Sequence, residues 1–197
     1  MAKKKMIVGF KGVALAPVTT NTVTSYVAEA ADGIPYAGQM TRTDKETSQD
    51  FFYDDELYAQ VKDTTGADVE LRFAEMPLDM MAELGLGTLD ETTGVLNADF
   101  NIPDKEYSLR CVCNTVSSVP RYINYRLFVL NGIKFDNFQT KGDSITACEV
   151  IMTGIIKRPA MASAAPIAYR DAKDDLSDLA ACDTWLKAAE TLPASGS

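Results

Sequence analysis

The side chains in this sequence that could do chemistry are four cysteines and several neighbouring carboxylates. The chain has no histidine, which excludes Ser-His-Asp and Cys-His catalysis and every metal site that uses an imidazole. Cys111 and Cys113 lie two residues apart on a predicted strand, so their thiols share a face, and this spacing is not the CxxC pattern of a metal site. We therefore expect these cysteines, with Cys148 and Cys182, to be buried free thiols.

The carboxylates that stand side by side are Asp54 with Asp55 and Asp90 with Glu91. Glycosidase chemistry needs two acids that face one bond, whereas adjacent residues point apart. The glycines within residues 84–94 neither open a helix after a strand nor precede a Lys-Ser or Lys-Thr pair, so they fit neither a dinucleotide-binding loop nor a phosphate-binding loop. We expect turns at these positions, no cofactor, no metal ion and no enzymatic activity.

The composition narrows the class of protein further. With 197 residues, of which 46% are hydrophobic, the chain has enough material for one substantial core. Its formal net charge of -9 disfavours binding to the phosphates of a nucleic acid or of an anionic membrane. No apolar run approaches the length of a transmembrane helix. We expect one main domain and no membrane partner.

Several segments alternate between apolar and polar residues, which is the pattern of a strand with one buried face. Strands are expected on this basis at residues 67–73, 107–113, 123–129, 6–15 and 22–30. A turn is expected at 31–33, and Asn131-Gly132 predicts a hairpin because this dipeptide stands between two alternating segments. The sequence therefore predicts a chain of mainly β structure with a meander at its centre.

One further strand is predicted within residues 138–159, and its second face is unusual. Val150, Met152 and Ile156 form a consistently apolar face, whereas the opposite face mixes polar residues such as Thr153 with isoleucines. Such a face is neither uniformly apolar, as in a buried core, nor uniformly polar, as on a solvent-exposed surface. We expect it to be partly covered by something outside the subunit, and a partner subunit is one candidate.

Two segments have the apolar spacing of helices. The first is 76–87, where Gly85 or Gly87 suits a left-handed helix end. The second lies within 169–192, and its apolar stripe consists of Leu176, Leu179, Cys182 and Leu186. A connector of small residues precedes this second helix, so we expect residues 159–197 to form an appendage outside the main sheet that packs on its own subunit.

Residues 36–63 combine many acidic residues with an aromatic cluster. The acids include Asp44, Glu46, Asp50, Asp54, Asp55 and Glu56, and the aromatic residues are Phe51, Phe52, Tyr53 and Tyr58. One interpretation is a loop or long hairpin whose aromatic side chains fold back onto the core, and composition favours it. The other is an extended projection that docks on a neighbouring subunit through these aromatic side chains.

The segments of this chain follow one another in a characteristic order. They are VGFKGVALAPV, FFYDDELY, ADVELRFAEMPLDMMAELGLG, RYINYRLFVLNGIKFDNFQTKGD and TGIIKRP. As an ordered set they resemble the major tail protein, or tail tube protein, of long-tailed, siphovirus-type bacteriophages. VELRFAEMPLDMMAELG and the FQTKGD passage before the last strand carry the resemblance most clearly. It covers about residues 6–158, and residues 159–197 lie outside it.

The resemblance implies a β-sandwich or barrel-like tail-tube domain at 1–158 with one short flanking helix, and it leaves 159–197 as a linker plus a C-terminal helical appendage. Such subunits form six-membered rings whose inner sheets join, and the rings stack into the tube of the viral tail. The implied function is that of a structural virion protein, made in the cytoplasm of the host bacterium, which forms the conduit for DNA during genome ejection.

The resemblance also implies partners. They are further copies of the chain, a tape-measure protein in the lumen, and the tail terminator and distal tail proteins, while DNA passes through without specific binding. The four aromatic residues of 36–63 become expected inter-subunit contacts, because the resemblance favours the docking interpretation. The six acids named there become expected lumen-facing or loop carboxylates, which keep phosphate from sticking.

Two other functions fit the sequence. An inner-tube protein of a contractile or secretion apparatus shares the ring architecture, and a sheath-binding exterior would distinguish it. A monomeric ligand-binding β-sandwich would use the same aromatic and acidic side chains to line a surface site. Assembly that depends on protein concentration separates the tube-forming functions from the monomeric one.

Overall fold

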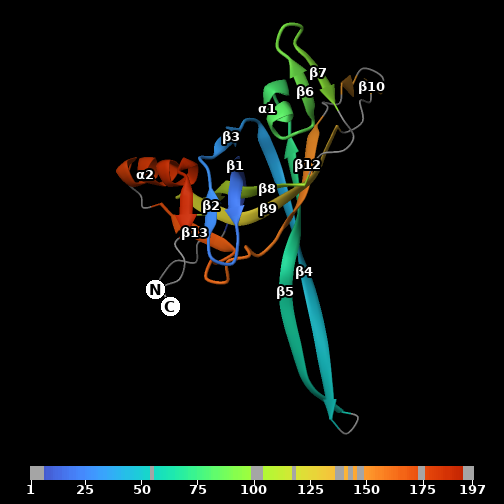
Figure 1. The fold of residues 1–197 in the computed structure, drawn as a ribbon, viewed down its shortest axis with the longest axis vertical. Coiled ribbons are helices and arrows are strands. Elements are labelled where there is room, and N and C mark those ends of the chain that lie inside the picture. Colours follow the sequence, from blue (N-terminus) through green and yellow to red (C-terminus); the bar gives the residue numbers. More distant parts are fainter. Residues whose placement is uncertain are drawn as a thin grey trace.

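The computed structural model describes residues 7–53, 56–98, 104–116, 119–135, 140–141, 144–145, 149–172 and 176–192, and it describes side chains within 9–48, 63–98, 104–116, 119–135, 149–172 and 178–192. The described chain is mainly β structure, which confirms the expected class. Figure 1 shows a curved sheet as the body of the molecule, with helices at its margins and one long hairpin that extends away from it.

One antiparallel sheet contains β1 (Ile7–Asn21), β2 (Tyr26–Ala28), β3 (Asp32–Ile34), β4 (Ala37–Tyr53), β5 (Glu56–Phe73), β8 (Lys105–Thr115), β9 (Arg121–Phe135), β12 (Val150–Ile156), β13 (Ile167–Asp171) and β14 (Glu190–Leu192). Its strands run in the order β14-β2-β1-β8-β9-β12-β5-β4, with β3 also paired to β1 and β13 to β9. Two small sheets pair β6 (Gly87–Asp90) with β7 (Val95–Ala98) and β10 (Thr140–Lys141) with β11 (Ser144–Ile145). The helices are α1 (Leu78–Glu83) and α2 (Leu176–Lys187).

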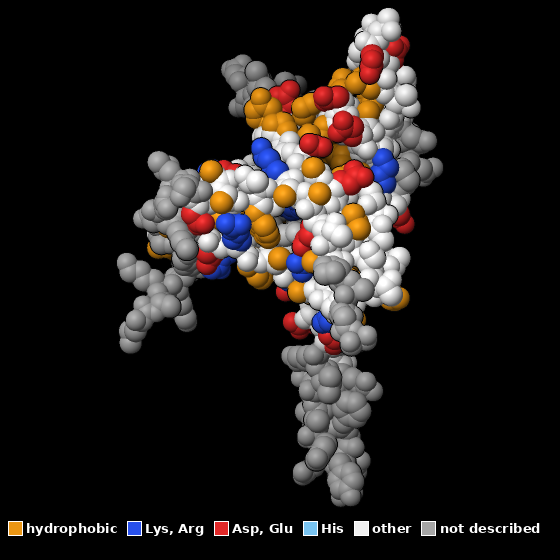
Figure 2. Space-filling view, turned by 60° about the vertical axis from the view of Figure 1, so that its left-hand side comes forward, with side chains coloured by type: hydrophobic (Ala, Val, Ile, Leu, Met, Phe, Trp, Pro, Cys, Tyr) orange, Lys and Arg blue, Asp and Glu red, His pale blue; other side chains and the backbone are white. Residues whose placement is uncertain are grey.

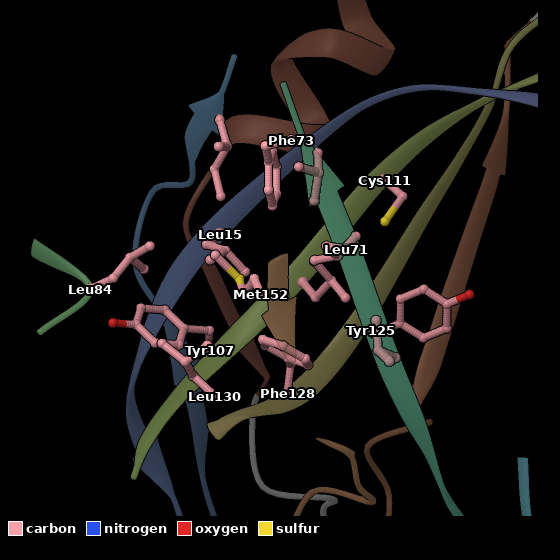
Figure 3. Packing of buried hydrophobic residues seen from close by; sticks show 14 of the residues in the cluster. Leu15, Leu71, Phe73, Leu84, Tyr107, Cys111, Tyr125, Phe128, Leu130 and Met152 are labelled. Carbon is pink, nitrogen blue, oxygen red and sulfur yellow. The ribbon is translucent and has the colours of Figure 1, made fainter. Parts of the chain in front are cut away.

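The main core lies inside the curve of the large sheet (Figure 3). Its buried side chains include Leu15, Leu71, Phe73, Tyr107, Leu109, Cys111, Tyr125, Phe128, Leu130 and Met152. The sheet curls far enough that Met40 of β4 meets Cys111 of β8, with Sδ and Sγ 3.6 Å apart. The alternation predicted at 67–73 and 107–113 is confirmed, because the odd residues of both segments are buried in this core.

The strand β9 departs from the predicted alternation. Up to Tyr125 its odd residues face the main core, Phe128 and Leu130 face it next, and beyond Asn131 the odd residue Ile133 packs against it. The pairing of β9 with β8 shifts register between Tyr125 and Phe128, and a bulge of this kind moves the following side chains to the opposite face. Leu127 and Val129 are buried, but they lie outside the main core that they were expected to join.

The hairpin predicted at Asn131-Gly132 is wrong, because β9 continues through both residues. The turn that Asn-Gly favours needs positive φ at both central residues, and neither residue has it. Gly132 pairs with Thr153 and Leu130 with Gly154, so Asn131 is the extra residue of a bulge. Pairing along β12 therefore outweighs the local turn preference.

The strand β12 realises part of the segment predicted within 138–159. Val150, Met152 and Ile156 face the main core as expected, and residues 146–148 lie outside the described residues. On the opposite face Ile151 is buried, while Thr153 and Ile155 are half-buried. A Cβ at Gly154 would overlap the ring of Phe128 and the carbonyl of Val129, so glycine is what allows β9 and β12 to approach.

The helix α1 ends as the sequence predicts, at a left-handed glycine. Gly85 has φ 90°. Its N–H donates to the carbonyl of Ala82, and the N–H of Leu86 donates to the carbonyl of Met81. These two bonds form a Schellman motif, which satisfies carbonyls that the helix end leaves free. The predicted turn at 31–33 is instead the start of β3, which pairs with β1.

The segment expected as a linker and helix also contributes two strands that the sequence did not indicate. Strands β12 and β13 pair one after the other with the same edge of β9. Between them, the N–H of Lys157 donates to the carbonyl of Leu127, and the N–H of Arg126 donates to the carbonyl of Pro166. Strand β14 pairs with β2. Residues 159–192 therefore join the large sheet at two places, although they were expected outside it. Each strand has five residues or fewer, which is too short for a clear alternation.

The outer face of β8 and β9 is covered by this C-terminal segment. Cys182 and Leu186 of α2 pack against Val112 and Tyr122. A further cluster between β1, β2 and the chain that follows β12 contains Ala14, Ala16, Tyr26, Ala28, Ala31, Met161 and Ala164. The two central strands thus have apolar contacts on both faces, and α2 packs on its own subunit as expected.

Candidate assembly surfaces

The β4–β5 hairpin has a base inside the sheet and a free-standing end (Figure 1). Strand β5 pairs with β12 from Ala67 to Phe73. From Gly66 toward the tip, the described residues of β4 and β5 pair only with each other. Thr65 is an extra residue in that ladder, and a Cβ on Gly66 would lie 2.5 Å from the carbonyl oxygen of Ile156. The hairpin therefore leaves the body at a bulge that requires glycine.

The aromatic residues predicted to contact a neighbour belong to this free-standing end. In the strand ladder Phe51 pairs with Ala59, Phe52 with Leu57 and Tyr53 with Glu56, while Tyr58 is an extra residue between two of these pairs. Their backbone is thus in strands of a hairpin, rather than in an irregular loop. Their side chains lie outside the described residues, so the predicted contacts stay a prediction.

Of the six predicted acids, two have described side chains. Asp44 and Glu46 are both exposed, and Oδ1 of Asp44 lies 2.6 Å from Nη2 of Arg42. Asp50 and Glu56 are described in backbone only, and residues 54–55 lie outside the described chain. Their assignment as lumen-facing or loop carboxylates therefore stays a prediction.

The outer face of β4 and β5 is polar, and the acids described below have basic partners. Asp68 lies 2.7 Å from the ammonium of Lys45. Glu70 and Glu149 lie 2.9 and 3.2 Å from the guanidinium of Arg72. The register sets Thr41, Glu70 and Thr153 in one row across β4, β5 and β12. This face offers hydroxyls and paired charges to solvent, not a continuous acidic surface.

The last strand of the sheet is β4, which leaves one of its edges without a partner strand in the described chain. It is 17 residues long. An exposed edge of this length presents a row of unpaired N–H and C=O groups to another chain. At the other end of the sheet, β14 has only three residues. The β4 edge is therefore the larger site for pairing with another strand.

Two of the cavities that described residues line on the body differ in charge. The first, of about 360 Å³, lies beside α1 and has an apolar floor that includes Leu15, Ile34 and Leu84. Its other lining residues include the acids Asp32, Glu83 and Glu106, with Lys105. Figure 2 shows acidic and hydrophobic side chains gathered at the height of α1. The first cavity therefore has an apolar floor with mainly acidic side chains around it.

The second cavity, of about 440 Å³, lies between β1 and β4. Its apolar lining consists of Phe10, Met40, Cys111, Cys113, Ile123 and Tyr125. The charged lining residue is Arg42, whose guanidinium carbon lies 5.6 Å from the centre of the Tyr125 ring. The sequence did not single out this cavity, because only the register of the curled sheet brings residues near 10, 40 and 111 together.

The described cysteines Cys111, Cys113 and Cys182 are free and buried, as expected. Burial raises the pKa of each thiol, most strongly at Cys111. A thiol with a raised pKa is a poor nucleophile at neutral pH. Within the described residues no group of three or more Cys, Asp and Glu side chains is arranged to hold a metal ion.

A buried polar cluster joins the C-terminal segment to the central strands. Nη1 of Arg110 donates to the carbonyl oxygens of Leu186 and Ala188, both at 2.6 Å. Glu190 accepts from the side-chain amide of Asn124 at 2.8 Å and from Nη2 of Arg126 at 2.8 Å. Each of these contacts ties α2 or β14 to β8 or β9. We interpret the cluster as a structural attachment, since its charged groups bind carbonyls and carboxylates of the same chain.

The chain matches no protein-family model and no curated protein sequence. The described helices are too short and too polar to span a membrane. The features of the described chain that bear on its function are the hairpin, the free edge of β4 and the cavities.

Proposed function

We propose that this protein is the subunit of a tail tube of the kind found in long-tailed bacteriophages, and that it works by assembling with copies of itself. The observation that carries the proposal is the β4–β5 hairpin, which projects from the body and bears a long strand edge without a partner in the described chain. An isolated two-stranded ribbon is marginally stable in water. A hairpin of this length is best explained by a surface that it meets in an assembly.

In this proposal the curved body supplies the wall of a ring. Its inner face is packed as a core, and the outer face of β4 and β5 is polar and open to solvent. Such a sheet suits a wall with protein on one side and water on the other. Paired charges such as Lys45 with Asp68 present little net positive charge to a passing phosphate chain.

The test is assembly as a function of concentration. Negative-stain electron microscopy and sedimentation of the concentrated protein are expected to show rings or tubes. A matched variant replaces residues 47–62 with a short turn, and it is expected to keep its thermal stability and to remain a monomer. A wild-type protein that stays monomeric at every concentration, salt and seed tested would count against the proposal.

A monomeric ligand-binding β-sandwich is the second candidate, and the specific observation in its favour is the cavity of about 360 Å³ beside α1. Its apolar floor and acidic surroundings would suit an apolar cation. Under this function the hairpin-deleted variant and the wild type would bind the same ligand, and both would be monomers in solution.

A further inference from the structure

The cavity between β1 and β4 arises because the sheet curls without closing. Among the described strands, β1 between Ile7 and Gly12 pairs only with β8, and β4 pairs only with β5. The two facing edges thus leave about 440 Å³ between them. Closing this gap would need side chains or a strand from elsewhere.

The lining of this cavity defines the chemistry of an occupant. Phe10, Met40 and Ile123 offer an apolar surface, which gains most from an aromatic side chain. Arg42 stands among them as the charged residue, stacked over Tyr125. An aromatic group therefore fits this lining, and a carboxylate beside it would share the guanidinium of Arg42 with Asp44.

The end of the β4–β5 hairpin has this composition. Its sequence, DFFYDDELY at residues 50–58, combines four aromatic with four acidic residues. The hairpin extends away from the body to which it belongs (Figure 1), so it cannot place its end in the cavity of its own chain. The occupant must then be the hairpin of another copy.

Charge separates the two cavities as receiving sites. The first cavity is surrounded by Asp32, Glu83 and Glu106, and the ammonium of Lys105 already donates to the carbonyl of Glu83 at 2.9 Å. An acidic hairpin end is repelled there. At the second cavity the guanidinium of Arg42 lies 2.6 Å from the carboxylate of Asp44, so the lining is close to neutral and repels an acidic hairpin end less than the first cavity does.

We propose that the cavity between β1 and β4 of one copy receives the aromatic end of the β4–β5 hairpin of a second copy. This rests on the proposed function and deepens it, because it names the surface that the hairpin meets. It also gives Arg42 and Met40 a role in recognition that their exposure on a strand does not suggest.

The first experiment fills each cavity in turn. Met40→Trp fills the proposed cavity, and Met80→Trp fills the cavity beside α1. The two methionines are matched, because both are partly buried against the main core. Met40→Trp is expected to raise the protein concentration needed for assembly about tenfold, and Met80→Trp to leave it unchanged. Equal assembly by the two variants and the wild type would overturn the docking proposal and leave the proposed function standing.

Thermal unfolding of both monomers checks that the substitutions have not simply disrupted folding. Should Met40→Trp unfold early, the exposed substitution Arg42→Glu takes its place. It is expected to weaken assembly, and the combination with Asp54→Lys and Asp55→Lys is expected to restore it. Failure of the charge exchange to restore assembly would contradict the proposal.

The second experiment places one thiol in the cavity lining and one at the hairpin end. The background is Cys148→Ser, in which the described native thiols are buried. Gln39→Cys supplies an exposed thiol in the cavity lining, Asp55→Cys supplies one at the hairpin end, and a short bismaleimide joins two thiols that lie close together. Assembled protein is expected to give covalent multiples of the 21.4 kDa chain, and these are expected to vanish when either engineered cysteine is left out. Assembled rings that give no such product would overturn the proposal, whereas absence of any wild-type assembly would count against the proposed function itself.

Discussion

The C-terminal segment and the β4–β5 hairpin are both additions to the central strands, and they are held in opposite ways. The C-terminal segment is tied down by a buried arginine, a half-buried carboxylate and an apolar cluster around Cys182. The described hairpin beyond Gly66 pairs only with itself as a strand ladder, and its contact with the body is the exposed ion pair of Asp63 with Arg158 at 3.8 Å. The comparison indicates that the first segment completes the subunit, whereas the second has its partner outside it.

The largest effect on stability is expected when the C-terminal segment loses its contact with Arg110. Arg110→Ala leaves the carbonyls of Leu186 and Ala188 without their donor and opens a space between α2 and β8. We expect the free energy of unfolding to fall by about 3–5 kcal/mol, measured by urea denaturation. Arg42→Ala on the exposed hairpin base is the control, with an expected loss below about 1 kcal/mol. Equal losses in the two variants would show that the C-terminal attachment contributes no more to the free energy of unfolding than the exposed hairpin base does.

A smaller loss is expected from a glycine in the body. Gly154→Ala places a Cβ against the ring of Phe128, and such overpacking costs about 1–3 kcal/mol. The control is Gly12→Ala in β1, since no atom lies within 4 Å of its added Cβ. Calorimetry of the two variants compares them. A melting temperature for Gly154→Ala equal to that of Gly12→Ala would contradict the close packing of β9 on β12.

Alkaline pH tests the same comparison, because every tyrosine with a raised pKa among the described side chains lies in the body. Burial is the main cause that raises the pKa of Tyr26, Tyr107 and Tyr125 to about 12. Between pH 10 and 12 the unfolded chain has lost these protons and the folded chain has kept them, so stability falls as pH rises through this window. Denaturation curves at pH 8 to 12 are expected to show the same decline with and without hairpin residues 47–62. A hairpin-deleted variant that resists alkali would contradict this placement.

The smallest effect is expected at the hairpin base. Lys45 and Asp68 are 2.7 Å apart, but their side chains are 44% and 55% exposed. Lys45→Ala should therefore change the free energy of unfolding by no more than about 0.5 kcal/mol. A loss as large as that of Gly154→Ala would show that the base of the hairpin is part of the folding unit.

The sequence predicts the strands in which buried and exposed residues alternate. It fails where pairing with a strand distant in the sequence determines the local structure. The odd residues of 67–73 are buried as their pattern indicates. Asn131-Gly132 has a turn signal, but β12 pairs along β9 past both residues. The bulge before Phe128 and the edge strand β14 likewise depend on partners distant in the chain. No local pattern contains that information.

The candidate site divides in the same way. The composition of residues 36–63 marks a segment of interest, and the structure adds that it is a hairpin with a free edge. The cavity between β1 and β4 has no sequence signature, because its lining comes from four strands. Arg110 also carries no signal, since it alternates like an exposed residue in a strand whose outer face is covered by α2.

The pairing of β2 with β14 has a consequence for the order of events during synthesis. Tyr26–Ala28 leaves the ribosome early, but its outer partner Glu190–Leu192 follows only after nearly all the described chain has been made. The carbonyls that bind Arg110 also belong to residues 186 and 188. The body thus cannot complete its packing while the chain is still growing, and contacts of such long sequence separation fold slowly. A nascent chain therefore passes through a period in which its hairpin has formed locally and its body has not.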